Sequence, residues 1–270
     1  MKKSIIITAL ATASITGLSL TSCDEIKEND RYIDMGEITA KRTVLLEEFT
    51  GQYCTNCPLA HESMEKIEEQ YSDNFIAVSI HATSLAINED PNAKIIGLKQ
   101  PEGDTYAQAW GVTIIPTGIV NRQGGLTGMS SWQGLVRAGI ESETPVDITL
   151  SANSDDADKN ITILTGIYSG ASIDCKLQIW VVEDGIVAPQ LGPSSVNPTY
   201  VHNNVFRTAV NGTWGEDIEL TTRESSYFTH SIEIKSNWNI ENTNIVAFVY
   251  TDKDGIIQAA KCKINGIATE

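Results

Sequence analysis

The feature that most constrains this chain is a pair of cysteines three residues apart, Cys54 and Cys57, between two segments of different periodicity. An apolar run at 43–49 precedes the pair and predicts a strand. Residues 58–71 follow it, with apolar side chains at helical spacing. Pro58 suits a first helical turn, where a missing N–H costs little. The pattern places the pair at a helix N-terminus, as a redox dithiol, a structural disulfide or part of a metal site.

The N-terminus indicates the compartment. Lys2 and Lys3 precede an apolar stretch at 5–20, which is the pattern of a secretory signal over residues 1–22. The ending "LTSC" resembles the bacterial lipobox, which implies that Cys23 accepts acyl chains and attaches the mature protein to a lipid membrane. Such a protein lies outside the cytosol, where disulfides persist.

Residues 23–41 are acidic and read as a flexible tether. Acids directly after a lipid-accepting cysteine resemble a surface-export signal of Bacteroidetes lipoproteins, although an ordinary solvated linker has the same composition. The expected location is therefore the outer membrane, facing either the cell surface or the periplasm. The formal net charge of -16 argues against nucleic acid as a partner.

The remainder of the chain has two halves. Residues 42–143 alternate strand and helix signals in the order β-α-β-(α)-β-β-α. Residues 145–270 hold seven short β-rich runs, and Asp-Gly at 184–185 and 254–255 favours hairpins. We therefore predict an α/β domain followed by an all-β sandwich of the immunoglobulin class. The sequence does not identify a binding partner for the sandwich.

Two residues outside the CxxC pair favour the redox interpretation of it. Glu48 lies six residues before Cys54 on the expected strand, and Pro116 opens another strand. Together with the CxxC pair, they resemble the thioredoxin superfamily over residues 42–143. The resemblance implies that Cys54 is the nucleophile, Cys57 the resolving thiol and Glu48 the proton acceptor and donor. Strand alternation lets only one of Glu47 and Glu48 face the pair, and the spacing favours Glu48.

The same resemblance implies a cis Ile115–Pro116 bond that holds an extended substrate chain. Tyr53 and His81 are candidates to flank the substrate, while packing for Tyr53 and a neutral structural role for His81 are the simpler interpretations. Thr55-Asn56 replaces the usual dipeptide of that superfamily, which leaves the direction of electron flow open. A segment at about 84–108 is longer than in a minimal thioredoxin and is expected to restrict or create a substrate groove.

Other polar residues have plainer interpretations. His61 and His81 are candidate metal ligands beside the pair, but a structural zinc site needs four ligands and no second CxxC is present, so we expect no metal. Cys175 and Cys262 both fall on expected strands, where a disulfide and two free buried thiols are equally compatible with the sequence.

The whole chain resembles the outer-membrane-protein-28-related lipoproteins of Bacteroidetes through "EEFTGQYCTNCP", "IIPTGIVNR", "YVHNNVFR" and "WGED". That resemblance implies a thioredoxin-like domain joined to an immunoglobulin-like one at the envelope. The expected function is thiol–disulfide exchange on envelope proteins, with no cofactor beyond the dithiol. The alternative is a binding lipoprotein whose first half is a scaffold with a structural disulfide.

Overall fold

The structure, a computed structural model, describes residues 40–90, 92, 96–155 and 159–266. The predicted signal segment 1–22, the lipid-accepting Cys23 and most of the tether lie outside these ranges. The first described residues form β1 (Ala40–Lys41), which pairs with β5 (Glu143–Thr144). Within the described ranges, no helix combines the length and apolar character that a bilayer crossing requires.

Three strands carry the cysteine segment. β2 (Val44–Thr50) lies between β3 (Phe75–His81), to which it is parallel, and β4 (Thr117–Val120), to which it is antiparallel. Every residue of β2 and β3 is buried. Strands covered on both faces are mostly apolar without alternation, so the two carboxylates within β2 stand out.

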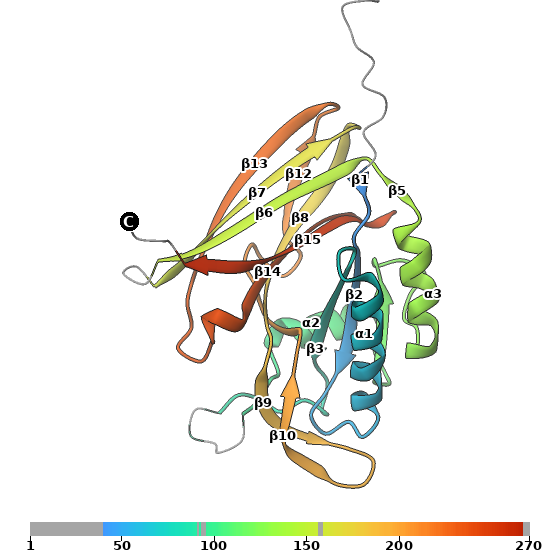
Figure 1. Cartoon of the computed structure of the whole chain (residues 1–270), viewed down its shortest axis with the longest axis vertical. Coiled ribbons are helices and arrows are strands. Elements are labelled where there is room, and N and C mark those ends of the chain that lie inside the picture. Colours follow the sequence, from blue (N-terminus) through green and yellow to red (C-terminus); the bar gives the residue numbers. More distant parts are fainter. Residues whose placement is uncertain (1–39, 91, 93–95, 156–158, 267–270) are drawn as a thin grey trace, which may run out of the picture. The chain divides into compact units, whose positions relative to one another are not determined.

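Helices cover both faces of these strands (Figure 1). α1 (Cys57–Tyr71) and α3 (Met129–Ile140) pack on one face, in a cluster that includes Leu46 of β2. α2 (Pro101–Ala109) contributes to the cluster on the opposite face, which includes Leu45. Because side chains alternate along a strand, Glu48 points to the face of α1 and Glu47 to that of α2.

Where the second half is described, it is built almost entirely of strands, with one short 3-10 helix, η2 (Ile240–Asn242). Its strands are β6 (Val146–Asp155), β7 (Asn160–Ser169), β8 (Ile173–Glu183), β9 (Ile186–Leu191), β10 (Val196–His202), β11 (Val205–Ala209), β12 (Glu216–Leu220), β13 (Glu224–Glu233), β14 (Thr243–Thr251) and β15 (Gly255–Gly266).

The prediction of an α/β thioredoxin-like domain followed by an all-β immunoglobulin-like sandwich is wrong. β11 pairs in parallel with β3, where Val205 lies opposite Ser79, and antiparallel with β8 on its other edge. In the described chain, one mixed 11-stranded sheet of order β13-β7-β6-β15-β14-β8-β11-β3-β2-β4, with β12 beside β8, therefore crosses both halves. Strand makes up 49% and helix 18% of the described residues.

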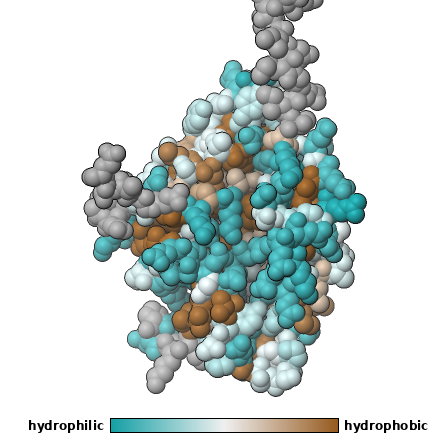
Figure 2. Space-filling view, viewed as in Figure 1, coloured by the Kyte–Doolittle hydropathy of each residue, from teal (hydrophilic) through white to brown (hydrophobic). Residues whose placement is uncertain are grey.

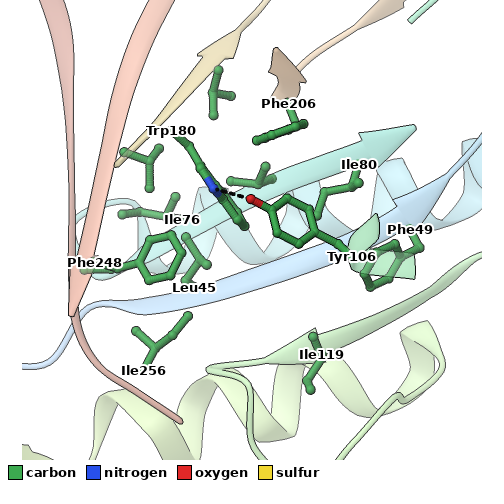
Figure 3. Close-up of a cluster of buried hydrophobic side chains, with 14 of the residues drawn as sticks. Leu45, Phe49, Ile76, Ile80, Tyr106, Ile119, Trp180, Phe206, Phe248 and Ile256 are labelled. Carbon is green, nitrogen blue, oxygen red and sulfur yellow. Dashed lines mark hydrogen bonds between the residues drawn. The ribbon is translucent and has the colours of Figure 1, made fainter. Parts of the chain in front are cut away.

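The two halves also share one hydrophobic core. Leu45 of β2 and Tyr106 of α2 pack in the same cluster as Trp180 of β8, Phe206 of β11 and Phe248 of β14 (Figure 3). Trp180 donates a hydrogen bond from Nε1 to the Tyr106 hydroxyl at 3.1 Å. The rings meet mostly edge to face, an arrangement that aromatic side chains favour. Neither half buries these rings alone.

Only one of the two predicted Asp-Gly hairpins forms. Gly255, with φ +65°, turns β14 back onto β15, and the two strands pair directly. Gly185, with φ +71°, ends β8, but β9 then leaves the large sheet and pairs with β10 alone. The β9–β10 hairpin, residues 186–202, is important for the site described next.

Candidate functional site

The two cysteines of the CxxC pair form a disulfide, Cys54–Cys57, with Cα atoms 5.5 Å apart. α1 begins at Cys57, and Pro58 occupies its first turn, as the sequence predicts. The N-terminal N–H groups of α1 therefore face the disulfide, and the positive end of a helix stabilises a thiolate. Cys54 is 4% exposed and Cys57 0%, so the first cysteine alone offers any surface.

Backbone contacts hold the loop that leads into the disulfide. Cys54 N donates to Gly51 O at 3.0 Å, and Tyr53 N donates to Leu85 O at 2.8 Å. Gly51 lies so close to Leu85 that an added Cβ would be 2.6 Å from the Leu85 carbonyl group. Leu85, at the start of the expected insert at about 84–108, therefore supports this loop. Tyr53 itself projects outward and is 54% exposed.

The β9–β10 hairpin of the second half also binds this loop. Gln190 Nε2 donates to Cys54 O at 2.9 Å and to Gly51 O at 3.2 Å. Leu191 N donates to Gln52 O at 2.8 Å. The sequence does not predict this contact, because neither Gln190 nor Leu191 carries a motif. The hairpin limits access to Cys54 from its side of the site.

Glu48 of β2 lies in an environment that is unusual for a carboxyl group. It is 0% exposed, and neither carboxylate oxygen has a hydrogen-bond partner among the described residues. Burial raises the pKa of Glu48 to about 8, against the smaller opposing effect of the Thr50 and Ser79 hydroxyls. At neutral pH the group is therefore an uncharged acid that holds a proton.

Three histidines gather on the same face as Glu48. His61 of α1 and His81 of β3 both lie near His202 of β10, with ring centroids 6.3 and 5.3 Å from that of His202. Burial lowers the pKa of His61 to about 3 and of His202 to about 4, and it lowers that of His81 as well. Among the described residues, no group of three or more His, Cys, Asp or Glu side chains is arranged to hold a metal ion.

His61 connects this cluster to β2 and to the hairpin. Its Nε2 lies 3.0 Å from the Thr50 hydroxyl and 3.8 Å from Glu48 Oε2. Its Nδ1 lies 2.9 Å from the hydroxyl of Tyr200 on β10. From the sequence alone, His61 is predicted only as a candidate metal ligand. Tyr200 and His202 fall in the "YVHNNVFR" stretch, which is the one signal in the sequence that draws attention to them.

The Ile115–Pro116 peptide bond is cis. Thr117 lies opposite Phe49 in the β4–β2 ladder, so Pro116 lies beside Thr50, at the end of β2 that leads into the cysteine loop. The preceding Ile114 is 77% exposed. Proline is tolerated here because it precedes the strand and donates no ladder hydrogen bond.

Within the part of the chain that the structure describes, Cys175 and Cys262 are free thiols. Cys262 lies opposite Ile245 of β14, and Ile245 lies opposite Val181 of β8. Val181 and Cys175 are about 20 Å apart along β8 at the rise of a strand, whereas a disulfide joins Cα atoms about 4–7 Å apart. The possible Cys175–Cys262 disulfide is therefore not formed. Burial raises the pKa of both thiols to about 11.

Two solved structures resemble this chain along most of its length. HBP35 of Porphyromonas gingivalis is 18% identical with a TM-score of 0.65, over 85% of this chain and 78% of that chain. A protein from Agrobacterium tumefaciens is 15% identical with a TM-score of 0.50, over 86% and 98%. At these identities the likeness shows the fold alone.

Other comparisons concern part of the chain. A domain of the outer membrane lipoprotein Omp28 from Porphyromonas gingivalis is 23% identical, over 46% of this chain and 90% of that one, with a TM-score of 0.33. Comparison with curated proteins found no match. The family model described as Outer membrane protein Omp28 matches residues 103–267, more than half of the sequence. The chain therefore belongs to the Omp28 family of outer membrane proteins.

Proposed function

We propose that this outer membrane protein exchanges thiols and disulfides with polypeptides at the cell envelope, attached to the membrane through acylated Cys23. One observation carries the proposal. Glu48 is a fully buried, proton-holding acid on the face against which α1 packs. His61, 3.8 Å from Glu48, lies four residues after Cys57 in α1, about 6 Å along the helix axis. A buried carboxyl without a hydrogen-bond partner lowers the stability of the folded protein. Proton transfer to a cysteine explains why this protein keeps a carboxyl there.

Thiol–disulfide exchange at this site requires only Cys54, Cys57 and Glu48 of the protein, together with a substrate thiol. A substrate thiolate attacks Cys54 Sγ, a new S–S bond forms, and the Cys54–Cys57 bond breaks. The electron pair leaves on Cys57 Sγ, and Glu48 protonates it. A second substrate thiolate then displaces Cys54, which releases the oxidised substrate and leaves the dithiol. In the reverse direction, Cys54 attacks a substrate disulfide and Cys57 resolves the mixed disulfide.

Exposed apolar side chains near the disulfide support a polypeptide substrate. Tyr53 and Leu59 flank the cysteines, and Ile114 precedes the cis-proline. The hairpin adds Val187 and Val201, which are cross-strand partners. A hydrophobic patch lies in the lower part of Figure 2, where Figure 1 shows the hairpin. Apolar surface of this kind is typical of sites that bind other chains.

The proposal is tested by trapping. A Cys57→Ala protein retains the attacking thiol and lacks the resolving one, so it should accumulate mixed disulfides with envelope proteins. Cys54→Ala/Cys57→Ala is the matched control, and Cys175 and Cys262 remain in both variants. Adducts that appear equally in both variants would reject the proposal. Loss of membrane attachment in Cys23→Ser tests the lipid anchor separately.

A second candidate, a binding protein with a structural disulfide, is compatible with the hydrogen bonds between Gln190 and the cysteine loop. The two candidates differ in the acidity of Cys54. After reduction, an exchange site should alkylate with iodoacetamide at a pKa below the ordinary value of about 8.5. A buried structural pair should show slow alkylation with no such titration.

A further inference from the structure

We propose that His61 is a proton-relay residue, which connects the buried carboxyl of Glu48 to solvent through the hydroxyl of Tyr200 on the β9–β10 hairpin. The inference deepens the proposed thiol–disulfide exchange and rests on it. It assigns the hairpin a part in the reaction, although the hairpin comes from the other half of the chain.

The need for a relay follows from burial. Glu48 is 0% exposed on β2, and both its oxygens are sealed from water. Each reduction of the disulfide takes a proton from Glu48, and each oxidation returns one. Between these two steps Glu48 is a buried carboxylate below its own pKa of about 8, so it takes up a proton from solvent, and a carboxyl sealed from water gains or loses that proton only through a neighbouring group.

The geometry provides one chain of such groups. From Glu48 Oε2 the distance to His61 Nε2 is 3.8 Å, and from His61 Nδ1 to the Tyr200 hydroxyl it is 2.9 Å. The Thr50 hydroxyl, 3.0 Å from His61 Nε2, lies beside the longer step. Tyr200 is partly exposed, so the relay connects the buried Glu48 carboxyl to the protein surface.

The protonation states suit this task. Burial, with a smaller contribution from His202, lowers the pKa of His61 and keeps its imidazole neutral. A neutral imidazole has one donor and one acceptor nitrogen. It can give its Nε2 proton to the Glu48 carboxylate while its Nδ1 takes the Tyr200 proton, which solvent then replaces. The imidazole changes tautomer and carries no net charge.

Several other titratable groups lie around the relay residues and contribute to the pH dependence of the proton relay. His202 lowers the pKa of both His61 and His81, and His61 lowers the pKa of His81 as well. Burial, with smaller contributions from Glu65, Glu48 and Glu62, raises the pKa of the Tyr200 phenol to about 12. The phenol is therefore protonated throughout the working range and is available as a donor.

The test measures reduction of the Cys54–Cys57 disulfide by dithiothreitol in the full-length protein, between about pH 5 and 9. The variants are His61→Gln and Tyr200→Phe, and the second keeps the ring and its packing. Matched controls are His230→Gln and Tyr227→Phe on β13, far along the sheet from the disulfide. Near-UV circular dichroism checks that each variant is folded.

We expect both relay variants to slow reduction by about 10- to 100-fold below pH 8, as removal of an acid–base group does, and by less above it. The controls should match the wild type. Added imidazole should restore much of the rate of a His61→Gly protein, which a purely structural role of His61 would not explain. Wild-type rates and profiles in folded Tyr200→Phe would overturn the relay.

The failure of the relay differs from the failure of the proposed function. If Cys57→Ala traps envelope proteins but His61→Gln and Tyr200→Phe are as fast as the wild type, exchange occurs without the relay. If Cys57→Ala traps nothing and wild-type Cys54 alkylates like an ordinary buried thiol, the exchange function itself is wrong, and the relay is rejected with it.

Discussion

Arg122 donates a hydrogen bond from Nε to Glu47 Oε1 at 2.6 Å, in a place where both side chains are almost fully buried. Glu47 comes from β2, and Arg122 follows β4. Aromatic rings from both halves surround the guanidinium, with centroids 4.4 to 6.0 Å from its Cζ atom: Trp110, Trp180, Trp214, Phe248 and Tyr250. Two of its nitrogens have no hydrogen-bond partner among the described residues, and cation–π attraction to these rings stabilises the charge instead.

The first prediction concerns this ion pair. Glu47→Gln removes the negative charge and leaves the buried Arg122 cation unpaired, so we expect a loss of about 3–5 kcal/mol in the free energy of unfolding. Urea denaturation measures it. Glu141→Gln is the matched control, because Glu141 pairs with Arg137 on the surface and such pairs contribute about 0–1 kcal/mol. Equal losses in the two variants would show that burial of the Glu47–Arg122 pair has no energetic weight.

The second prediction concerns Glu48 and alkaline pH. Its folded pKa, about 8, is raised above the unfolded value of 4.5. The unfolded chain therefore releases this proton first as pH rises, and the folded state loses stability between about pH 4.5 and 8. Glu48→Gln removes this dependence. Its stability relative to wild type should rise by on the order of 4 kcal/mol across that window, measured by urea denaturation at several pH values. A constant difference would contradict the raised pKa.

The third prediction concerns acid pH. His202 has a folded pKa of about 4, lowered by burial from 6.5. Its contribution to stability is complete above pH 6.5 and is lost as pH falls toward 4, because the unfolded chain binds the proton first. His202→Gln should lessen the acid loss by on the order of 3 kcal/mol. His230→Gln on β13 serves as control, and an unchanged acid slope in His202→Gln would contradict the prediction.

Much of the local structure near the cysteines follows from the sequence. The expected strand at 43–49 and helix at 58–71 correspond to β2 and α1, because a proline in the first turn and helical spacing are local signals. The N-cap of α3 was less predictable. Gly128 holds that position, and no side-chain cap bond forms there.

Long-range pairing could not be predicted in the same way. The run 201–210 reads as a single strand, but Asn204, with φ +57°, interrupts it and separates β10 from β11. That interruption directs β10 to the cysteine loop and β11 to β3. A left-handed residue at one position carries no periodic signal, so both the shared sheet and the histidine cluster depend on contacts that the sequence does not display.

The fourth prediction tests the shared core directly. Phe206 of β11 is 1% exposed, and its ring lies 5.7 Å from that of Tyr106 and 5.2 Å from that of Trp180. Phe206→Ala should cost about 3–5 kcal/mol, the usual loss for a buried phenylalanine. Phe228→Ala on β13, where the ring is only partly buried, is the control and should cost less.

The same variant distinguishes one folding unit from two. Because the sheet and core cross both halves, destabilisation by Phe206→Ala should lower the protection of amide hydrogens in α1 and in β14 by the same free energy. Hydrogen exchange followed by mass spectrometry reads both segments in one experiment. If β14 loses protection while α1 keeps the wild-type value, the halves unfold independently. Equal losses would mean that the cysteine loop stays in place only while the strands of the second half are folded.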